Sequence, residues 1–344
     1  MRSISRALVP ITVLALLLTS CGAATTSPPA PSTAAGASAA PEPIKIKASY
    51  GNVTPANLAP FMAKELGLFA KRGLDVDLVL IDGGSPSAAA LIAGQVHLAN
   101  FGGSEAMSLV AAGSDIAVIA LFVPVTPWQL LAKSDYQQPS DLRGKVVGVA
   151  SKGGSSEVAA DLSLQRLNLD PNKDVTKQSL GSVANLTAAM IGGAVYAGPG
   201  HPPDTVLLLK NGFKVIVDLA KEKLPATDNT TVVRKSYAAA NKQVVQSYID
   251  AEIEAIAMAK KDKATTVKVL GKLLKLEDQE ALGQAYDFYV TQIMPTYPHV
   301  TAAPFNAVRD TLAATNAAVK NLDVMKVIDD SYVADAEKRG VGGP

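Results

Sequence analysis

The sequence predicts an α/β protein of two lobes, in which each lobe is a mostly parallel sheet covered by helices. Two observations predict this class. From residue 44 to residue 233, short apolar segments alternate with segments of helical spacing, and loops rich in Gly, Ser and Pro separate them. Pro124 and Pro127 interrupt this alternation, and a second series begins after them. The sequence therefore contains two α/β series, followed by a helical segment.

The first series repeats a strand, a loop and a helix three times. Thr54 and Pro55 suit the N-cap and the first position of the first helix. Ser85 and Pro86 suit the same two positions in the second helix, and residues 102–104 open the third. The expected strands are residues 44–49, 75–81, 97–101 and 116–122.

The second series has the same build. Residues 151–156 open one helix, Gly181 and Ser182 precede another over residues 183–191, and residues 198–203 form the loop before a third. A loop at residues 224–229 then leads back to a last strand. The expected strands are residues 128–133, 145–150, 175–180, 194–197, 214–218 and 230–233.

From Tyr237 to the end of the chain, apolar residues recur at helical spacing, and the last two expected helices are residues 305–319 and 324–328. One α/β lobe, an inserted α/β lobe and a helical return predict a plan with two crossovers between the lobes. The crossings, near residues 123–126 and 225–229, should lie side by side and act as a hinge. The expected division is lobe 1 over residues 44–124 and 230–344, and lobe 2 over residues 125–229.

The N-terminal segment predicts an exported lipoprotein. Basic residues precede a short apolar run, which ends in a Leu-Thr-Ser-Cys tetrapeptide closing at Cys21 and looks like a bacterial lipobox. The run is too short to span a bilayer stably. Between Cys21 and residue 43, every residue but Glu42 is Gly, Ala, Ser, Thr or Pro, a composition typical of a disordered tether. We expect a signal peptide over residues 1–20, an acylated Cys21 and a tether over residues 21–43, on the extracytoplasmic side of a membrane.

The composition excludes several classes of protein. Hydrophobic residues make up 48% of the chain and charged residues 18%, as in an ordinary globular protein. The formal net charge of +1 gives no sign of nucleic-acid binding. Cys21 is the only cysteine, and His97, His201 and His299 are far apart, so neither a disulfide nor a metal site is expected.

Six loops share one arrangement, in which small residues, most often with a hydroxyl, lie between a strand and a helix. Free backbone N–H groups and the positive end of the helix dipole collect at such places. In an open parallel sheet these loops meet at the carboxyl edge, so two sets of them would face each other across a cleft. The sequence therefore predicts a small-molecule site between the lobes. The loops are residues 50–54, 83–85, 102–104, 153–156, 181–182 and 201–203.

Several residues near these loops have two interpretations. Lys152 either pairs with a ligand anion or is solvated, and Trp128 either packs in a core or forms a wall of the cleft. Tyr50, at a strand end, has the same two interpretations as Trp128. His201 suits a turn at the rim of the cleft better than a catalytic site, because no nucleophile with a local signature appears. Residues 82–84 lack the lysine of a phosphate-binding loop, which argues against nucleotide binding.

Five segments carry a resemblance to a known family. Residues 66–76 are Leu-Gly-Leu-Phe-Ala-Lys-Arg-Gly-Leu-Asp-Val, and residues 91–99 are Leu-Ile-Ala-Gly-Gln-Val-His-Leu-Ala. Residues 141–149 are Asp-Leu-Arg-Gly-Lys-Val-Val-Gly-Val, residues 202–203 with 210–213 are Pro-Pro and Lys-Asn-Gly-Phe, and residues 329–333 are Asp-Asp-Ser-Tyr-Val. Over about residues 44–334 the chain resembles the substrate-binding lipoproteins of nitrate/sulfonate/taurine-type (NitT/TauT) ABC transporters. The resemblance implies a two-lobed type 2 periplasmic-binding-protein fold with two hinge crossovers.

By this resemblance, loops of both lobes contact the ligand. Many relatives have Ser-Pro-Pro where this chain has His201-Pro202-Pro203, so that wall of the site is altered. With the two ambiguous residues Trp128 and Lys152 added, the expected ligand contacts are Tyr50, Asn52, Gly84, Ser85, Gly103, Ser104, Trp128, Lys152, Gly154, Ser155, Ser156, Ser182, His201 and Pro202.

The resemblance implies a monomeric extracytoplasmic solute-binding protein, without enzymatic activity or cofactor, that works with the permease and ATPase of an ABC importer. Two ligand classes stay open. Hydroxyls at helix N-termini favour a small organic anion, such as a sulfonate, taurine, nitrate or a carboxylate. Aromatic residues at strand ends leave a thiamine-precursor pyrimidine or another planar ring open. A cleft enzyme on the same fold is the remaining alternative, although relatives that make a thiamine pyrimidine use a cysteine-rich segment that this chain lacks.

Overall fold

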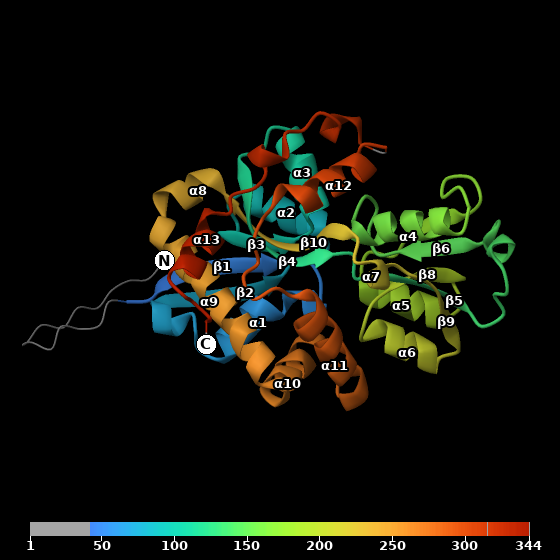
Figure 1. Cartoon of the computed structure of the whole chain (residues 1–344), viewed down its shortest axis with the longest axis horizontal. Helices are drawn as coiled ribbons and strands as arrows, with labels where there is room; N and C mark the ends of the chain where they lie inside the picture. The colour runs from blue at the N-terminus through green and yellow to red at the C-terminus, as the bar shows by residue number, and fades with distance from the viewer. Residues whose placement is uncertain (1–41, 315, 344) are drawn as a thin grey trace, which may run out of the picture. The chain divides into compact units, whose positions relative to one another are not determined.

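The computed structural model describes residues 42–314 and 316–343, which form helices around two five-stranded sheets (Figure 1). The predicted signal peptide, Cys21 and nearly all of the predicted tether lie outside the described residues, so these features remain predictions. In the described part of the chain, no helix is long and apolar enough to cross a membrane.

The first sheet has the strand order β2-β1-β3-β10-β4. β1 pairs in parallel with β2 along its whole length, and β3 pairs in parallel with β1. β10 lies between β3 and β4 and runs antiparallel to both (Figure 1). The strands are β1 (Ile44–Tyr50), β2 (Leu74–Leu80), β3 (Leu98–Phe101), β4 (Ile116–Val125) and β10 (Pro225–Arg234).

The second sheet has the strand order β7-β6-β8-β5-β9. β6 is parallel to β7 and β8, whereas β5 is antiparallel to β8 and β9. Each sheet therefore has four strands in one direction and an opposed strand in fourth place, and the predicted α/β class with mostly parallel sheets is confirmed. The strands are β5 (Gln129–Lys133), β6 (Val146–Val149), β7 (Thr176–Ser179), β8 (Ala197–Gly200) and β9 (Phe213–Asp218).

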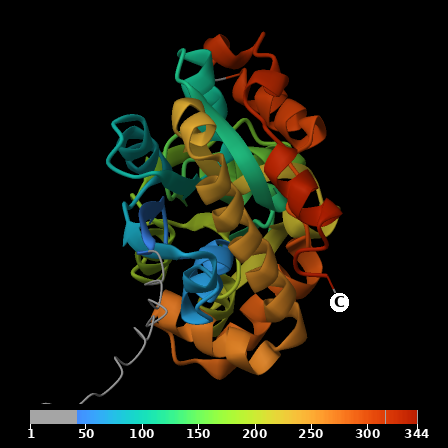
Figure 2. The same ribbon diagram turned by 90° about the vertical axis from the view of Figure 1, so that its left-hand side faces the viewer.

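Helices bury both faces of the first sheet. Successive residues of β4 enter different apolar clusters, as the alternation of side chains along a strand requires. Ala117 and Ile119 pack with residues of α1 and α9, whereas Val118 packs with residues of α2, α3 and α12. Figure 2 shows α9 running beside α1. The helices are α1 (Leu58–Glu65), α2 (Gly84–Ile92), α3 (Gly103–Ala111), α4 (Ser155–Arg166), α5 (Val183–Ile191), α6 (Asp204–Lys210), α7 (Leu219–Glu222), α8 (Lys235–Ala240), α9 (Lys242–Lys261), α10 (Lys263–Leu274), α11 (Gln279–Tyr286), α12 (Ala302–Leu312) and α13 (Ser331–Lys338).

The two predicted crossings lie side by side, as expected. Val125 is opposite Pro225 and Val123 is opposite Asn229 in the pairing of β4 with β10, and the Thr126 N–H donates to the Leu224 carbonyl at 2.8 Å. The prediction of a loop at residues 224–229 is wrong, because β10 already begins at Pro225. The irregular register of the pairing between Pro225 and Thr230 shows that this part of the ladder is interrupted.

Another expected element is displaced along the chain. The strand expected at residues 194–197 is β8 at Ala197–Gly200, so Gly198, Pro199 and Gly200 are strand residues instead of loop residues. They pair with β5, and a Cβ on Gly198 would lie only 2.9 Å from Leu186 Cδ1 of α5. A strand so close to a helix requires small residues. In the sequence, the same Gly and Pro residues are typical of a turn.

The C-terminal region is less regular than its apolar spacing predicts. The helix expected over residues 305–319 is α12 (Ala302–Leu312), followed by a 3-10 turn at Ala317–Val319. The helix expected from Val324 is a 3-10 turn, Val324–Lys326, capped by the Asp323 carboxylate. The helical character of this region is thus confirmed, although its elements are shorter than expected.

Candidate functional site

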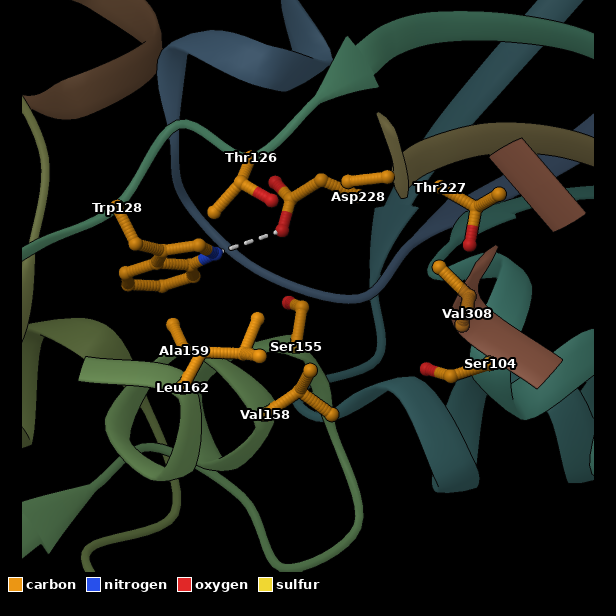
Figure 3. Close-up of a pocket in the computed structure, with 11 residues that line it drawn as sticks. Ser104, Thr126, Trp128, Ser155, Val158, Ala159, Leu162, Thr227, Asp228 and Val308 are labelled. Carbon is orange, nitrogen blue, oxygen red and sulfur yellow. Dashed lines mark hydrogen bonds between the residues drawn. The ribbon is translucent and has the colours of Figure 1, made fainter. Parts of the chain in front are cut away.

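Two adjoining cavities lie where the loops of the two sheets meet, and they share Trp128, Ser155 and Asp228. The first, called here the apolar cavity, has a free volume of about 30 Å³. Figure 3 shows the Trp128 indole and side chains of α4 on one side of it, with Thr227, Ser104 and Val308 on the other. Its lining residues are Ser104, Thr126, Trp128, Ser155, Val158, Ala159, Leu162, Ala226, Thr227, Asp228 and Val308.

The second cavity, called here the polar cavity, has a free volume of about 50 Å³. Loops after β1, β2 and β3 of the first sheet line it together with loops after β6 and β7 of the second. The carboxyl edges of the two sheets therefore do meet at one place, as the loop pattern predicts. Its lining residues are Gly51, Asn52, Asp82, Gly83, Gly84, Phe101, Gly102, Glu105, Trp128, Ala150, Ser151, Ser155, Ser156, Gly181, Ser182, Val183 and Asp228.

Seven of the fourteen predicted ligand contacts line these cavities, and seven do not. Ser85 and Lys152 are exposed and line a wider depression of about 430 Å³ outside the cavities. The residues that line the cavities are Asn52, Gly84, Ser104, Trp128, Ser155, Ser156 and Ser182. The residues that line neither the cavities nor this depression are Tyr50, Gly103, Gly154, His201 and Pro202.

Most predicted hydroxyls at the helix starts are engaged by the chain itself. Ser156 Oγ accepts from the Ala150 N–H at 3.0 Å, and Ser182 Oγ caps α5 by accepting from the Asn185 N–H at 3.2 Å. Ser104 Oγ donates to Glu105 Oε2 at 2.8 Å. These bonds fix the shape of the loops. The Ser104 O–H is already donated to Glu105, whereas Ser156 and Ser182 act as acceptors in these bonds and keep their own O–H donors.

The start of α2 differs from the prediction. Ser85 does not cap this helix, because Gly83 is the N-cap and Ser85 lies within the first turn. Gly83 has a φ of 96°, a conformation that a residue with a side chain rarely adopts. The Gly-Gly pair at residues 83–84 therefore makes the turn, and the first-turn serine points to the outside.

Two predicted aromatic contacts have different surroundings from those expected. Tyr50 packs edge to face on Phe61, with the ring centroids 4.9 Å apart, and belongs to a core wall. His201 is 1% exposed and lies between Trp128 and Tyr289, with ring centroids 4.6 and 5.6 Å away. The expected position of His201 at the cleft rim is wrong, because β8 continues to Gly200 and carries His201 behind Trp128.

Trp128 joins the two cavities. Its indole is 4% exposed, and Nε1 donates to Asp228 Oδ1 at 2.9 Å (Figure 3). Asp228 also accepts from the Ser155 hydroxyl, and His201 lies near enough for its charge to act on the carboxylate. Burial raises the pKa of Asp228, while His201, Ser155 and Trp128 act in the opposite direction. Both interpretations of Trp128 therefore apply: it packs in a core with Ala150, Ala159, Val183 and Leu219, and it also forms a wall of both cavities.

Glu105 is the second acidic group of the site, and the sequence analysis missed it. It is the third residue of α3 and lines the polar cavity, where its carboxyl group is enclosed by protein although part of the side chain is accessible. Burial raises the pKa of Glu105, the Ser104 hydroxyl and its own backbone N–H lower it, and Asp228 raises it further. The site thus contains two neighbouring acids.

Neither acid gives a strong signal in the sequence. Glu105 follows Gly102, Gly103 and Ser104, and a glutamate in a first helical turn is an ordinary companion of the helix dipole. Asp228 lies in the segment that was expected to be a hinge loop. The clues in the sequence were therefore indirect: Glu105 directly follows a loop assigned to the cleft, and Asp228 lies in a segment assigned to a crossing between the lobes. In the described residues, no group of three or more His, Cys, Asp or Glu side chains could hold a metal ion.

A family model described as NMT1/THI5 like matches residues 55–265, which is more than half of the chain. The chain belongs to the NMT1/THI5-like family. The matched part of this NMT1/THI5-like chain includes both acids, Trp128 and the two crossings between the sheets.

Two curated proteins are relatives of this NMT1/THI5-like chain. YtlA of Bacillus subtilis (strain 168), named as a binding protein, is 24% identical over 56% of this chain and 59% of its own length. The match thus spans less than two thirds of YtlA. The riboflavin-binding protein RibY of Chloroflexus aurantiacus is 25% identical over 73% of this chain and 74% of its own length.

Solved structures share the fold. The periplasmic aliphatic sulphonate binding protein SsuA of Escherichia coli has a TM-score of 0.68 at 22% identity, covering 84% of this chain and 93% of SsuA. The desulfurization enzyme DSZB has a TM-score of 0.61 at 16% identity, covering 86% of this chain and 99% of DSZB. The predicted two-lobed fold of periplasmic binding proteins is therefore confirmed, and the same fold also occurs in an enzyme.

Proposed function

We propose that this protein is the solute-binding component of an ABC-type importer and holds a small organic molecule in the two cavities between its sheets. The observation that carries the proposal is the lining of the polar cavity, to which loops of both sheets contribute polar side chains. Sites of this kind are typical places for small ligands. The relatives named as binding proteins support the same class of function.

Binding on this proposal requires the lobes to move. The free volumes of about 30 and 50 Å³ leave little room for a ligand to enter while the loops of the two sheets are in contact. We take the described conformation as closed. Entry would open the cleft about the interrupted ladder of β4 and β10, with lobe 1 over residues 44–124 and 230–344 and lobe 2 over residues 125–229.

The proposal includes the surroundings of the protein. We propose that it lies outside the cytoplasm as a monomer, tethered through an acylated Cys21, and delivers its ligand to the permease and ATPase of the importer. Stable attachment requires more than one acyl chain. The proposed ligand contacts are the seven predicted residues that line the cavities, with Glu105, Asp228, Thr126 and Thr227 added.

Of the two ligand classes that the sequence leaves open, the cavities favour a planar ring over a small anion. Trp128, Val158 and Leu162 offer an apolar surface to a ring. Glu105 and Asp228 oppose a sulfonate, nitrate or carboxylate, and Lys152 lies outside the cavities.

We propose binding without turnover. Cys21, the only cysteine, precedes the described fold. Ser155 donates to Asp228, so it is not paired with a histidine base, and His201 is packed behind Trp128. The arrangement lacks the nucleophile–base pair that covalent catalysis requires.

A thermal-shift screen of planar nitrogen heterocycles, sulfonates and carboxylates on the purified protein tests this proposal. A hit should bind in calorimetry, return unchanged in mass spectrometry, and reduce the radius of gyration in small-angle scattering. Trp128→Ala should weaken the hit by about tenfold or more, because it removes a cavity wall and a partner of Asp228. Conversion of the hit, or binding without contraction, would contradict the proposal.

A further inference from the structure

The Glu105 carboxylate lies where three helices begin. A Cβ on Gly84, the first residue of α2, would lie 2.5 Å from Glu105 Oε1. A Cβ on Gly102, the N-cap of α3, would lie 2.5 Å from Oε2, and one on Gly154, the N-cap of α4, 3.4 Å from Oε1. The three glycines leave room for the carboxylate between the N-termini of α2, α3 and α4.

This is the position in which the sequence analysis expects a ligand anion. First-turn N–H groups without an intrahelical acceptor and the positive ends of the dipoles favour negative charge there. In the structure the chain supplies that negative charge itself, through Glu105. A sulfonate or carboxylate entering the polar cavity would meet a like charge instead of a vacant anion site.

Neither acid of the site forms an ion pair with a basic side chain of the described residues. In the described part of the chain, neither Glu105 nor Asp228 forms an ion pair with a lysine or an arginine. The charge of Lys152, at the outer depression, acts on Glu157. Among the described residues, His201 is the basic side chain near Asp228, and Glu105 has no basic side chain of this kind beside it.

A second observation points to a ligand at the same place. Thr126 and Thr227 are 6% and 3% exposed and line the apolar cavity, and their hydroxyls have no hydrogen-bond partner among the described residues. Figure 3 shows the Thr227 hydroxyl directed toward Ser104 and Val308. The residues are nearly buried, but their hydroxyl oxygens are not fully enclosed, so the hydroxyls can be reached from the cavity and are suited to hydrogen bonds with a bound molecule.

We propose that Glu105 is the residue that determines the charge of the ligand: it occupies the anion position with its own carboxylate, so the protein takes an organic cation. The ammonium or amidinium group of this ligand lies between Glu105 and Asp228, and its apolar part enters the apolar cavity beside Trp128. The inference rests on the proposed function, and it deepens it by naming the class of ligand.

Benzamidine, benzamide and benzoate test this inference, because they share one shape and carry charges of +1, 0 and −1. Calorimetry should show that the wild-type protein binds benzamidine about ten- to hundredfold more tightly than benzoate, as expected for hydrogen bonds to a charged group. Glu105→Gln keeps the shape of the side chain and should remove most of this preference. Glu105→Ser vacates the anion position and should bind benzoate measurably.

Glu157→Gln is the matched control. Glu157 is the third residue of α4, as Glu105 is of α3, but it pairs with Lys177 and lines another depression outside both cavities. This variant should leave the ratio of benzamidine to benzoate affinity unchanged. A fall in that ratio as large as that of Glu105→Gln would overturn the assignment to Glu105.

Three other results would overturn the inference. They are tighter binding of benzoate than of benzamidine by the wild type, an unchanged preference in Glu105→Gln, and no binding of any probe by either the wild type or Glu105→Ser. Binding of benzoate by Glu105→Ser alone would support it even if the wild type bound no probe. Should Glu105→Ser not fold, Glu105→Gln still decides the role of the charge. Failure of the proposed function would appear separately, as conversion of a bound molecule or as binding without contraction.

Discussion

Two helices of this protein begin with nearly the same residues, yet their glutamates have opposite surroundings. Gly102-Gly103-Ser104-Glu105 opens α3, and Gly154-Ser155-Ser156-Glu157 opens α4. Burial raises the pKa of Glu105, which has no cation beside it. Burial also acts to raise the pKa of Glu157, but the Gly153 N–H and Lys177 together bring it below its ordinary value. The local sequence therefore determines where each helix starts, whereas the direction of the glutamate's pKa shift depends on whether the fold places a basic side chain beside it.

The same difference recurs deeper in the molecule. Glu252 of α9 is buried, accepts from the Thr231 hydroxyl at 3.0 Å, and has no partner for Oε1 among the described residues. In the other half of the chain, Glu157 and Asp161 both pair with Lys177. Among the described residues, Glu252 like Glu105 has no basic partner, whereas Glu157 and Asp161 share Lys177.

The largest expected effect is a pH dependence caused by Glu252. Burial raises the pKa of Glu252 to about 8, against an ordinary value of 4.5. Because the folded protein keeps a proton that the unfolded chain has released, the unfolding free energy falls as pH rises from 4.5 to 8. The loss from this group is up to about 5 kcal/mol. Guanidinium unfolding at pH 5 and pH 8 should show it, and Glu252→Gln should reduce the pH dependence of the unfolding free energy by the part that Glu252 contributes. An equal change in unfolding free energy between pH 5 and pH 8 in the wild type and in Glu252→Gln would contradict this assignment.

A smaller effect is expected for the lysine of the second half. Lys177 Nζ lies 3.0 Å from Glu157 and 2.7 Å from Asp161, and all three side chains are less than one fifth exposed. Lys177→Met leaves two partly buried carboxylates without a counter-charge and should cost about 2 kcal/mol. Urea unfolding at pH 7 should show a lower midpoint with an unchanged m-value. Lys173→Met is the control, because Lys173 is exposed and should leave the midpoint unchanged. A Lys177→Met midpoint equal to that of Lys173→Met would refute the comparison.

The smallest expected effect is on ligand affinity, and it comes from an ion pair between the two halves of the molecule. Lys210 of α6 lies 2.8 Å from Asp278 and 3.1 Å from Glu280 at the start of α11, on an exposed surface. Because this contact exists in the conformation that we take as closed, Lys210→Met should weaken ligand binding, by less than about threefold. Titration at low and high salt measures it, since high salt should abolish the difference. A stronger affinity in the variant would show that the pair opposes closure.

Much of the fold could be predicted from the sequence, because hydrophobic period and helix caps are local signals. The helix expected over residues 183–191 is α5 at Val183–Ile191, with Ser182 as its cap. The strand expected at residues 194–197 lies instead at residues 197–200. In the sequence its Gly and Pro residues indicate a turn, and only the structure shows that a helix packs against them. The division into lobes, the hinge motion and the anchor at Cys21 remain predictions.

The candidate site could be predicted in part. Small residues at helix starts correctly indicated which loops meet, but not what fills the space between them. The Ser104 hydroxyl donates to Glu105 instead of facing a ligand. This depends on the position of the Glu105 side chain, which the spacing of residues in the sequence does not predict. Asp228 required the pairing of β10 with β4, which joins segments about a hundred residues apart. The acidic character of the site therefore follows from tertiary contacts, which bring Glu105 and Asp228 together.

The position of β10 has a consequence for how the first sheet folds while the chain is being synthesised. All strands of the second sheet come from the continuous segment between Gln129 and Asp218, whereas β10, in fourth place in the first sheet, ends only at Arg234. A chain that emerges from its N-terminus therefore has β3 and β4 long before the strand that must lie between them. Until residue 234 has emerged, those two strands have exposed edges of the kind that aggregate. A chaperone that protects the first sheet would matter most during that interval.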